Sequence, residues 1–165
     1  MTYLDTSALI KRFVAEKGTP VVSALVTREG PIATAKIAYA EMYAALARRH
    51  REGDLSSTQH ARACRDFEQD WPAYLQVDLR DDILRLARDL VQRHPLRGFD
   101  AVHLASALSL RAALGEQIRF VAADDRLLRA ALVEHCAVLD VETTTDWNLG
   151  QREPGCATRS ARSRS

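Results

Sequence analysis

Four acidic side chains interrupt apolar segments, where a carboxylate is unexpected. Asp5 breaks the apolar run in "MTYLDTSALI", and Asp124 comes directly after "FVAA". Glu41 and Asp100 fall on helical faces that are otherwise apolar, because Glu41 follows Ile37 by one turn and Asp100 lies one turn before Leu104. A charge taken out of water needs a partner, a proton or a metal ion. These four acids are therefore the first candidates for chemistry.

Several carboxylates in one place favour a hard divalent cation. Carboxylates about 4 Å apart repel each other by roughly 1–4 kcal/mol per pair, and oxygen ligands of this kind suit Mg²⁺ or Mn²⁺, whereas zinc would want His or Cys. Such a site recruits phosphate oxygens and lowers the pKa of a bound water, which predicts hydrolysis of a phosphodiester. Thr6 and Ser7, directly after Asp5, either hydrogen-bond a carboxylate or a phosphate or cap the next helix.

Each acid taken alone also has a structural interpretation. Asp5 and Asp100 can serve as helix N-caps, and Asp124 or Asp125 can cap the helix "DRLLRAAL". Glu41 can reach solvent from a rim position. Four such acids together favour a shared site over four separate caps.

The elements that must position these acids alternate along the chain. Strand-like segments lie at residues 2–5, 31–35, 75–79, 118–123 and 137–141. Helical patterns lie between them, at roughly 6–14, 18–28, 36–53, 56–71, 81–94, 99–114 and 125–135. Alternation of this kind predicts right-handed crossovers and a three-layer α/β/α domain of the α/β class with a central parallel sheet. Active sites of such sheets form beyond the carboxyl ends of the strands, where Asp5 and Asp124 lie.

Local signals define some of these helices in detail. Gly53 is placed to end one helix, and Ser56 with Gln59 has the spacing of a capping box for the next. The buried face of that second helix is predicted to follow Ala61, Cys64, Phe67 and Trp71. The helix at 81–94 is predicted to bury Ile83, Leu86, Leu90 and Val91.

Composition excludes several classes of protein. The chain has 165 residues, 47% of them apolar and 27% charged, which predicts one domain with a real core. It has no run of 18 apolar residues and no secretory signal pattern, so we expect no membrane span and no export. Its three cysteines (Cys64, Cys136 and Cys156) form no CxxC pair. This usage indicates the cytoplasm and argues against a disulfide framework or a zinc site.

Charge is unevenly distributed although the formal net charge is only +1. Residues 150–165 hold four arginines and one glutamate, which leaves 19 basic and 21 acidic residues for the remainder. A body without basic excess is unlike a protein that grips duplex DNA by charge alone. We therefore divide the chain into a domain at 1–148 and an Arg/Ser-rich tail at 149–165 that we expect to be disordered. The tail is either a solvated end or an auxiliary electrostatic tether.

Four motifs resemble one family. The stretches "LDTSALIKRF", "AYAEMYAAL", "RGFDAVHLASAL" and "FVAADDRLL" come in the order and approximate spacing of the PIN-domain family, most closely of VapC-type toxins of toxin–antitoxin pairs. The resemblance covers about residues 1–145. It implies a PIN fold and an endoribonuclease that depends on Mg²⁺ or Mn²⁺. It also implies a cognate antitoxin that blocks the site.

The resemblance carries the catalytic and metal-binding acids onto Asp5, Glu41, Asp100 and Asp124, and the hydroxyl position onto Thr6 and Ser7. His103 stands where "DAxHLA" variants often have histidine, and we expect it to pack or to support the site. The adjacent Asp125 leaves the fourth acid open by one residue, although the register of "FVAAD" favours Asp124.

The expected partners are an RNA substrate, the antitoxin and a second copy of the chain. Early-helix apolar residues either accept the partner or form core, namely Leu9, Phe13, Met42 and Leu46. Basic residues near the motifs either contact phosphates or are solvated, namely Lys11, Arg12, Arg97, Arg126 and Arg129.

Two other functions are compatible with part of the pattern. One is a PIN-type nuclease of housekeeping RNA processing that has no antitoxin. The other is a phosphoacceptor or phosphatase α/β domain, which also places an Asp after its first strand. Against the phosphatase, Ser7 occupies the position of a required second Asp, and the lysines (Lys11, Lys17 and Lys36) all lie in the first quarter of the chain.

Overall fold

A computed structural model describes residues 1–28 and 30–144 of the chain. Its centre is one sheet of five parallel strands in the order β3-β2-β1-β4-β5. The strands are β1 (Thr2–Leu4), β2 (Ile32–Ala35), β3 (Leu75–Val77), β4 (Arg119–Ala122) and β5 (Ala137–Asp140). The predicted alternation and the α/β/α architecture are therefore confirmed. The predicted tail, 149–165, lies outside the described residues, so the boundary at 148 stays a prediction.

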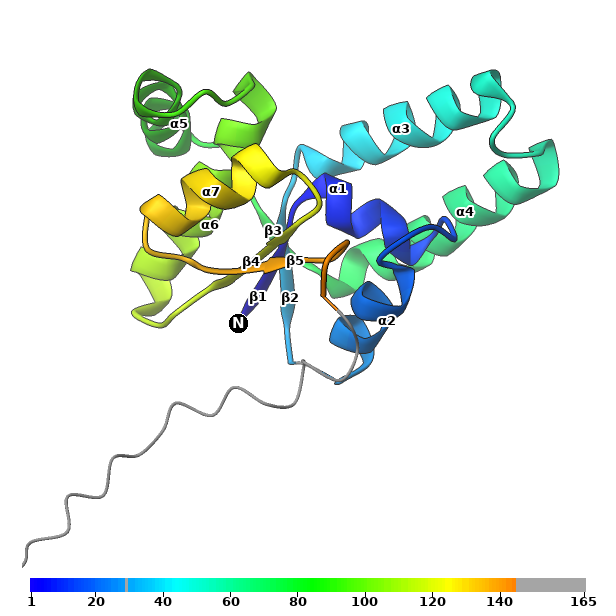
Figure 1. The fold of residues 1–165 in the computed structure, drawn as a ribbon, viewed down its shortest axis with the longest axis horizontal. Helices are drawn as coiled ribbons and strands as arrows, with labels where there is room; N and C mark the ends of the chain where they lie inside the picture. The colour runs from blue at the N-terminus through cyan, green and yellow to red at the C-terminus, as the bar shows by residue number, and fades with distance from the viewer. Residues whose placement is uncertain (29, 145–165) are drawn as a thin grey trace, which may run out of the picture.

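Helices cover both faces of this sheet (Figure 1). One face carries α1 (Thr6–Leu9), the short 3₁₀ helix η1 (Ile10–Arg12), α2 (Thr19–Arg28), α3 (Ala38–Glu52) and α4 (Ser57–Asp70). A second 3₁₀ turn, η2 (Trp71–Ala73), leads from α4 into β3. The other face carries α5 (Asp81–Arg93), α6 (Gly98–Leu114) and α7 (Asp125–Val133). The helices α3 and α4 lie side by side and project away from the sheet.

Alternating side chains of the central strands supply both cores. In β1, Tyr3 packs into the core under α5–α7, whereas Leu4 packs into the core under α1–α4. In β4, Phe120 and Val121 divide in the same way, and the ring of Phe120 stacks on that of Tyr3. Successive residues of a strand point to opposite faces, and a strand covered on both faces is therefore apolar throughout. Asp5 comes directly after such a strand.

The local helix signals are confirmed. The Ser56 hydroxyl accepts a hydrogen bond from the Gln59 backbone N–H, and the Gln59 side chain accepts one from the Ser56 N–H. Gly53 ends α3 with a φ of +88°, a left-handed conformation that disfavours other residues. No helix within the described ranges is both long and apolar enough to cross a membrane.

Two predicted helix faces are partly wrong. In α4 the buried residues are Ala63 and Phe67, and Ala61 is exposed. In α5 the buried residues include Ala87, while Val91 is 39% exposed. In both helices the residue that packs against the core is an alanine one turn from a large buried residue. An alanine gives little signal in a hydrophobicity pattern.

The early-helix apolar residues also divide. Leu9, Met42 and Leu46 are fully buried and belong to the core under α1–α4, whereas Phe13 remains partly exposed. Of the surface considered for a partner, only Phe13 is accessible.

The strand order reverses between β1 and β4. The chain steps outward from β1 through β2 to β3, and then returns to the other side of β1 with β4 and β5. In open parallel sheets, ligands bind beyond the carboxyl ends of the strands at this switch point.

Candidate active site

Three of the predicted acids gather at the switch point. Asp5 follows β1 directly, Asp124 follows β4 after one intervening residue, and Asp100 lies in the first turn of α6. Burial raises the pKa of Asp100, and the nearby negative charges of Asp5 and Asp124 raise it further. We call Asp5, Glu41, Asp100 and Asp124 the carboxylate edge.

Asp5 is a helix cap and a buried carboxylate at once. Its side chain is 7% exposed, and its Oδ2 accepts hydrogen bonds from the backbone N–H (3.0 Å) and the hydroxyl (2.6 Å) of Ser7. The Ser7 hydroxyl oxygen in turn accepts a hydrogen bond from the Ala123 N–H at 2.9 Å, which fastens the ends of β1 and β4 together. Asp5 Oδ1 faces His103 Nε2 at 3.6 Å.

Asp100 and Asp124 follow the same scheme. Asp124 Oδ1 accepts from the backbone N–H groups of Arg126 and Leu127, and Asp100 Oδ2 accepts from the N–H of Arg97. Within the described residues, the second oxygen of each carboxylate accepts no hydrogen bond. The capping interpretation and the site interpretation are therefore compatible, because one oxygen of each acid starts a helix and the other is left for a ligand.

Glu41, in the first turn of α3, reaches the carboxylate edge through two polar side chains. Its Oε2 accepts a hydrogen bond from the Thr6 hydroxyl at 2.6 Å and lies 2.7 Å from His103 Nε2. Burial alone would raise the pKa of Glu41, but the hydrogen bond and charge of His103 and the hydroxyl of Thr6 hold it below its usual value. Glu41 is therefore kept ionised.

His103 lies beneath the acids and is only 1% exposed. Its Nε2 contacts Glu41 and lies 3.0 Å from the Thr6 hydroxyl, and its Nδ1 lies 3.1 Å from the Tyr3 hydroxyl. Burial alone would lower the pKa of His103, but the charge of Asp5 and the hydrogen bond and charge of Glu41 outweigh it, and the net pKa is raised. Asp5 and Glu41 therefore favour the charged form of the imidazole, which offsets part of their negative charge.

Sequence reasoning missed one contributor, Tyr3. Its hydroxyl reaches His103 across 100 positions of the chain. The available signal was its place two residues before Asp5 in an apolar strand, because a hydroxyl-bearing side chain that is buried needs a polar partner.

The structure separates the adjacent acids Asp124 and Asp125. The Asp124 side chain is partly buried and its charge influences Asp100, whereas Asp125 is exposed and forms an ion pair with Arg129 one turn along α7. Only Asp124 joins the carboxylate edge.

Most of the predicted basic contacts are engaged elsewhere. Lys11 is buried and pairs with Glu16 (3.1 Å) and Glu142 (2.8 Å). Arg12 pairs with Asp70, and Arg129 with Asp125. Arg126 is still close to the acids, with its Nη2 3.7 Å from Asp124 Oδ2.

The donor set at the carboxylate edge fits a hard divalent cation. In the part of the chain that the structure describes, no three His, Cys, Asp or Glu side chains approach closely enough to enclose an ion by themselves. Mg²⁺ does not require such a cage, because it keeps several waters and binds through one or two carboxylates together with substrate phosphates. Ionised oxygens that repel one another and have unused acceptor positions suit that mode of binding.

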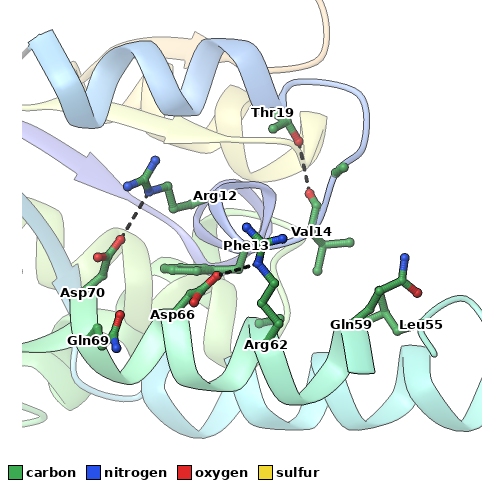
Figure 2. A pocket seen from close by; sticks show the side chains of 12 residues that line it. Arg12, Phe13, Val14, Thr19, Leu55, Gln59, Arg62, Asp66, Gln69 and Asp70 are labelled. Atoms are coloured by element: carbon green, nitrogen blue, oxygen red, sulfur yellow. Dashed lines mark hydrogen bonds and ion pairs between the residues drawn. The ribbon is translucent and has the colours of Figure 1, made fainter. Parts of the chain in front are cut away.

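A separate hollow of about 520 Å³ lies between η1 and α4 (Figure 2). Phe13 and Val14 contribute apolar surface to it, and the Arg12–Asp70 and Arg62–Asp66 ion pairs lie along its wall. None of the four acids lines it.

Comparison with known proteins identifies relatives over most of the chain. The PIN domain family matches residues 2–133. Ribonuclease VapC45 of Mycobacterium tuberculosis (strain CDC 1551 / Oshkosh) is 40% identical over 128 residues, which cover 78% of this chain and 86% of that protein. Ribonuclease VapC49 of strain ATCC 25618 / H37Rv matches with the same figures.

One solved structure, a toxin-antitoxin complex from Klebsiella pneumoniae, contains a chain of the same fold. It superposes with a TM-score of 0.60 at 17% identity, over 86% of this chain and 98% of that one. At this identity the likeness concerns the fold alone.

Proposed function

The chain belongs to the PIN-domain family, and from that premise we propose that it is a metal-dependent endoribonuclease and the toxin of a toxin–antitoxin pair. The observation that carries the proposal is the gathering of Asp5, Asp100 and Asp124 at the switch point of a parallel sheet, where each has an oxygen that accepts no hydrogen bond within the described residues. The 40% identity to two named ribonucleases over most of the chain supports RNA as the substrate.

PIN-domain ribonucleases are generally metal-dependent, and here the carboxylate edge would hold Mg²⁺ or Mn²⁺. When bound, such an ion would supply a water of lowered pKa and would neutralise phosphate charge. Asp5, Asp100 and Asp124 would hold the ion through the carboxylate oxygens that do not cap a helix. The cleavage needs no covalent nucleophile from the protein.

Glu41 has the features of the group that orients the attacking water. Thr6 and His103 hold its Oε2, which fixes the side chain and keeps it ionised at neutral pH. Its Oε1 then accepts the proton of the water that attacks phosphorus. His103 and Thr6 act through Glu41 and do not touch the RNA.

The antitoxin partner is supported by the neighbour that was solved as a toxin-antitoxin complex. The hollow between η1 and α4 is the surface we propose for it, because Phe13 exposes apolar area there and the charged pairs can meet an amphipathic segment. A homodimer and a cytoplasmic location complete the proposal.

Mapping cleavage sites in total RNA, with the purified chain in Mg²⁺, in Mn²⁺ and in EDTA, tests the enzymatic part. We expect discrete cuts with either metal and none in EDTA, while full cleavage in EDTA would contradict the metal mechanism. Where a small reading frame lies immediately upstream, co-expression with its product tests the partner. Failure of the two to co-purify would favour a housekeeping nuclease over a toxin.

A further inference from the structure

Two exposed aromatic side chains are close in sequence to acids of the carboxylate edge. Among the large apolar side chains that are exposed in the described residues, only Tyr39 (37%) and Phe99 (56%) are aromatic. Tyr39 is two positions before Glu41 on α3, and Phe99 is directly before Asp100 on α6. Single exposed apolar residues are ordinary, so the pairing of both with proposed site acids is the informative feature.

The ring of Tyr39 is already engaged within the protein. Its hydroxyl donates to Glu68 at 2.5 Å, and its centroid lies 5.3 Å from the ring centroids of Tyr43 and Trp71. Phe99 differs, because it belongs to neither core and has no ring contact within the described part of the chain. An apolar ring left in water costs free energy that a ligand would recover.

Helix geometry directs the Phe99 ring toward the site. Phe99 lies four residues before His103 on α6, so both occupy one face of the helix, one turn apart. Side chains of a helix lean toward its N-terminus. The N-terminus of α6 lies at the carboxyl edge of the sheet, and Phe99 therefore lies on the solvent side of His103, next to Asp100.

We propose that Phe99 stacks on an unpaired base of single-stranded RNA next to the phosphodiester that is cut. This inference rests on the proposed ribonuclease function and assigns Phe99 to it as a residue that positions the substrate. Only an unstacked base offers its face to a side chain, and stacking of this kind tolerates any base. Stacking also supplies attraction that does not depend on charge, at an edge whose acids repel the RNA backbone.

Steady-state cleavage of a single-stranded RNA oligomer that spans a mapped site tests this role. We expect Phe99→Ala to raise KM by about five- to a hundredfold, with kcat changed much less, and Phe99→Trp to restore KM. Leu132→Ala is the matched control, because Leu132 is 59% exposed but lies near the far end of α7. Its KM and kcat should equal those of the unchanged chain, and all three variants should keep its melting temperature.

A second substrate isolates the stacking contact. In this oligomer, the nucleotides that flank the cut carry abasic ribose, so the phosphates remain and the base faces are gone. The unchanged chain should bind the abasic oligomer more weakly than the intact one. Phe99→Ala should bind both oligomers with the same affinity, so the two proteins should have equal affinities for the abasic oligomer.

Three outcomes overturn the inference. Phe99→Ala with the KM of the unchanged chain on the intact oligomer excludes stacking. So does a Phe99→Ala chain that cuts RNA normally but no longer binds the antitoxin, since Phe99 would then contact protein. If the unchanged chain cuts no RNA at all in Mg²⁺ or Mn²⁺, the proposed function fails and this inference fails with it.

Discussion

Two regions of the described part of the chain each centre on a buried charged side chain, Lys11 or Asp5, and the regions differ in charge balance. The Lys11 cluster (Lys11, Glu16, Arg49 and Glu142) joins two acids to two bases through contacts of 2.6–3.1 Å. At the carboxylate edge three acids, Asp5, Glu41 and Asp100, act on the single imidazole of His103. The fourth, Asp124, acts on Asp100 and has only Arg126, 3.7 Å away, as a positive neighbour. The first region is neutralised from within the protein, whereas the second is left with negative charge that a cation would neutralise.

The backbone around the Lys11 cluster also shows that it is a structural fastening. Gly18 has a φ of +91°, and a Cβ there would lie 2.6 Å from the Val141 carbonyl oxygen and 3.0 Å from Lys11 Cδ. The chain before α2 and the chain after β5 therefore touch with no room for a side chain. We infer that substitutions in the Lys11 cluster reduce stability, whereas substitutions at the carboxylate edge reduce activity.

Asp5→Asn should show the largest effect, on cleavage. Asparagine retains the oxygen that caps α1 but loses the charge and one donor for metal, so cleavage in Mg²⁺ should fall by orders of magnitude. Melting in EDTA should hold or rise, because one of several repelling charges is gone. Asp5→Ala should in addition cost about 0.5–2 kcal/mol of stability through the lost cap. An Asp5→Asn chain that cuts RNA at the unchanged rate would end the assignment of Asp5.

The adjacent acids of α7 provide an internal control. Asp124→Asn should reduce cleavage strongly, because Asp124 influences Asp100 at the carboxylate edge. Asp125→Asn should leave cleavage unchanged, because Asp125 is exposed and faces Arg129. Equal losses in the two variants would mean that α7 is positioned differently in the active enzyme. The readout is the initial rate on one RNA oligomer.

Lys11→Met should show the largest effect on stability. It leaves Glu16 and Glu142 without their shared cation, and removal of one member of a buried pair costs up to about 3–5 kcal/mol. Because Glu142 is partly exposed to solvent, we expect a loss of about 2 kcal/mol in the free energy of unfolding. Lys36→Met is the matched control, since it breaks an exposed pair with Asp78 and should cost less than about 1 kcal/mol. Chemical denaturation in EDTA measures both, and equal losses would refute the contrast.

The pH dependence of stability should show the smallest effect, and it should come from the carboxylate edge. The raised pKa of His103 gives stability that is complete below its usual value of 6.5 and is lost as pH rises through the raised value. The lowered pKa of Glu41 gives stability that is present above its usual value of 4.5 and is lost as pH falls through the lowered value. Metal-free melting temperatures should therefore be highest between these limits.

The raised pKa of Asp100 acts in the opposite sense to that of Glu41. Its contribution is complete below the usual 3.8 and is lost as pH rises through the raised value. His103→Gln should remove the decline of the melting temperature at high pH. Lys11→Met should lower the melting temperature at every pH without changing the shape of its pH dependence. A His103→Gln profile that still declines in the same range would show that another group titrates there.

The contrast between the two regions also explains what the sequence could predict. Asp5 and Asp124 were predictable because a carboxylate directly after an apolar run marks the end of a buried strand, and parallel strands bring such ends to one edge. Lys11 was expected either to contact phosphate or to be solvated, and the structure instead buries it against acids. One of them, Glu142, lies 131 positions further along the chain. A pairing over that distance leaves no periodic signal.

The misplaced helix faces have a related cause. Ala63 and Ala87 are buried because of what lies opposite them, and their own hydrophobicity barely distinguishes them from exposed alanines. Similarly, the contact of Tyr3 with His103 depends on the packing of α6 against β1. Helix and strand positions follow from local pattern, whereas the partners of a side chain follow from the assembled sheet.

The central position of β1 has a consequence for protein synthesis. On one side β1 pairs with β2, which follows within thirty residues, but on the other it pairs with β4 at Arg119–Ala122. While residues 119–124 are still inside the ribosome, β1 cannot pair with β4. Asp5 then lacks its neighbour Asp124, and the carboxylate edge is incomplete. The active site of this RNA-cutting enzyme is therefore assembled only after most of the chain has left the ribosome.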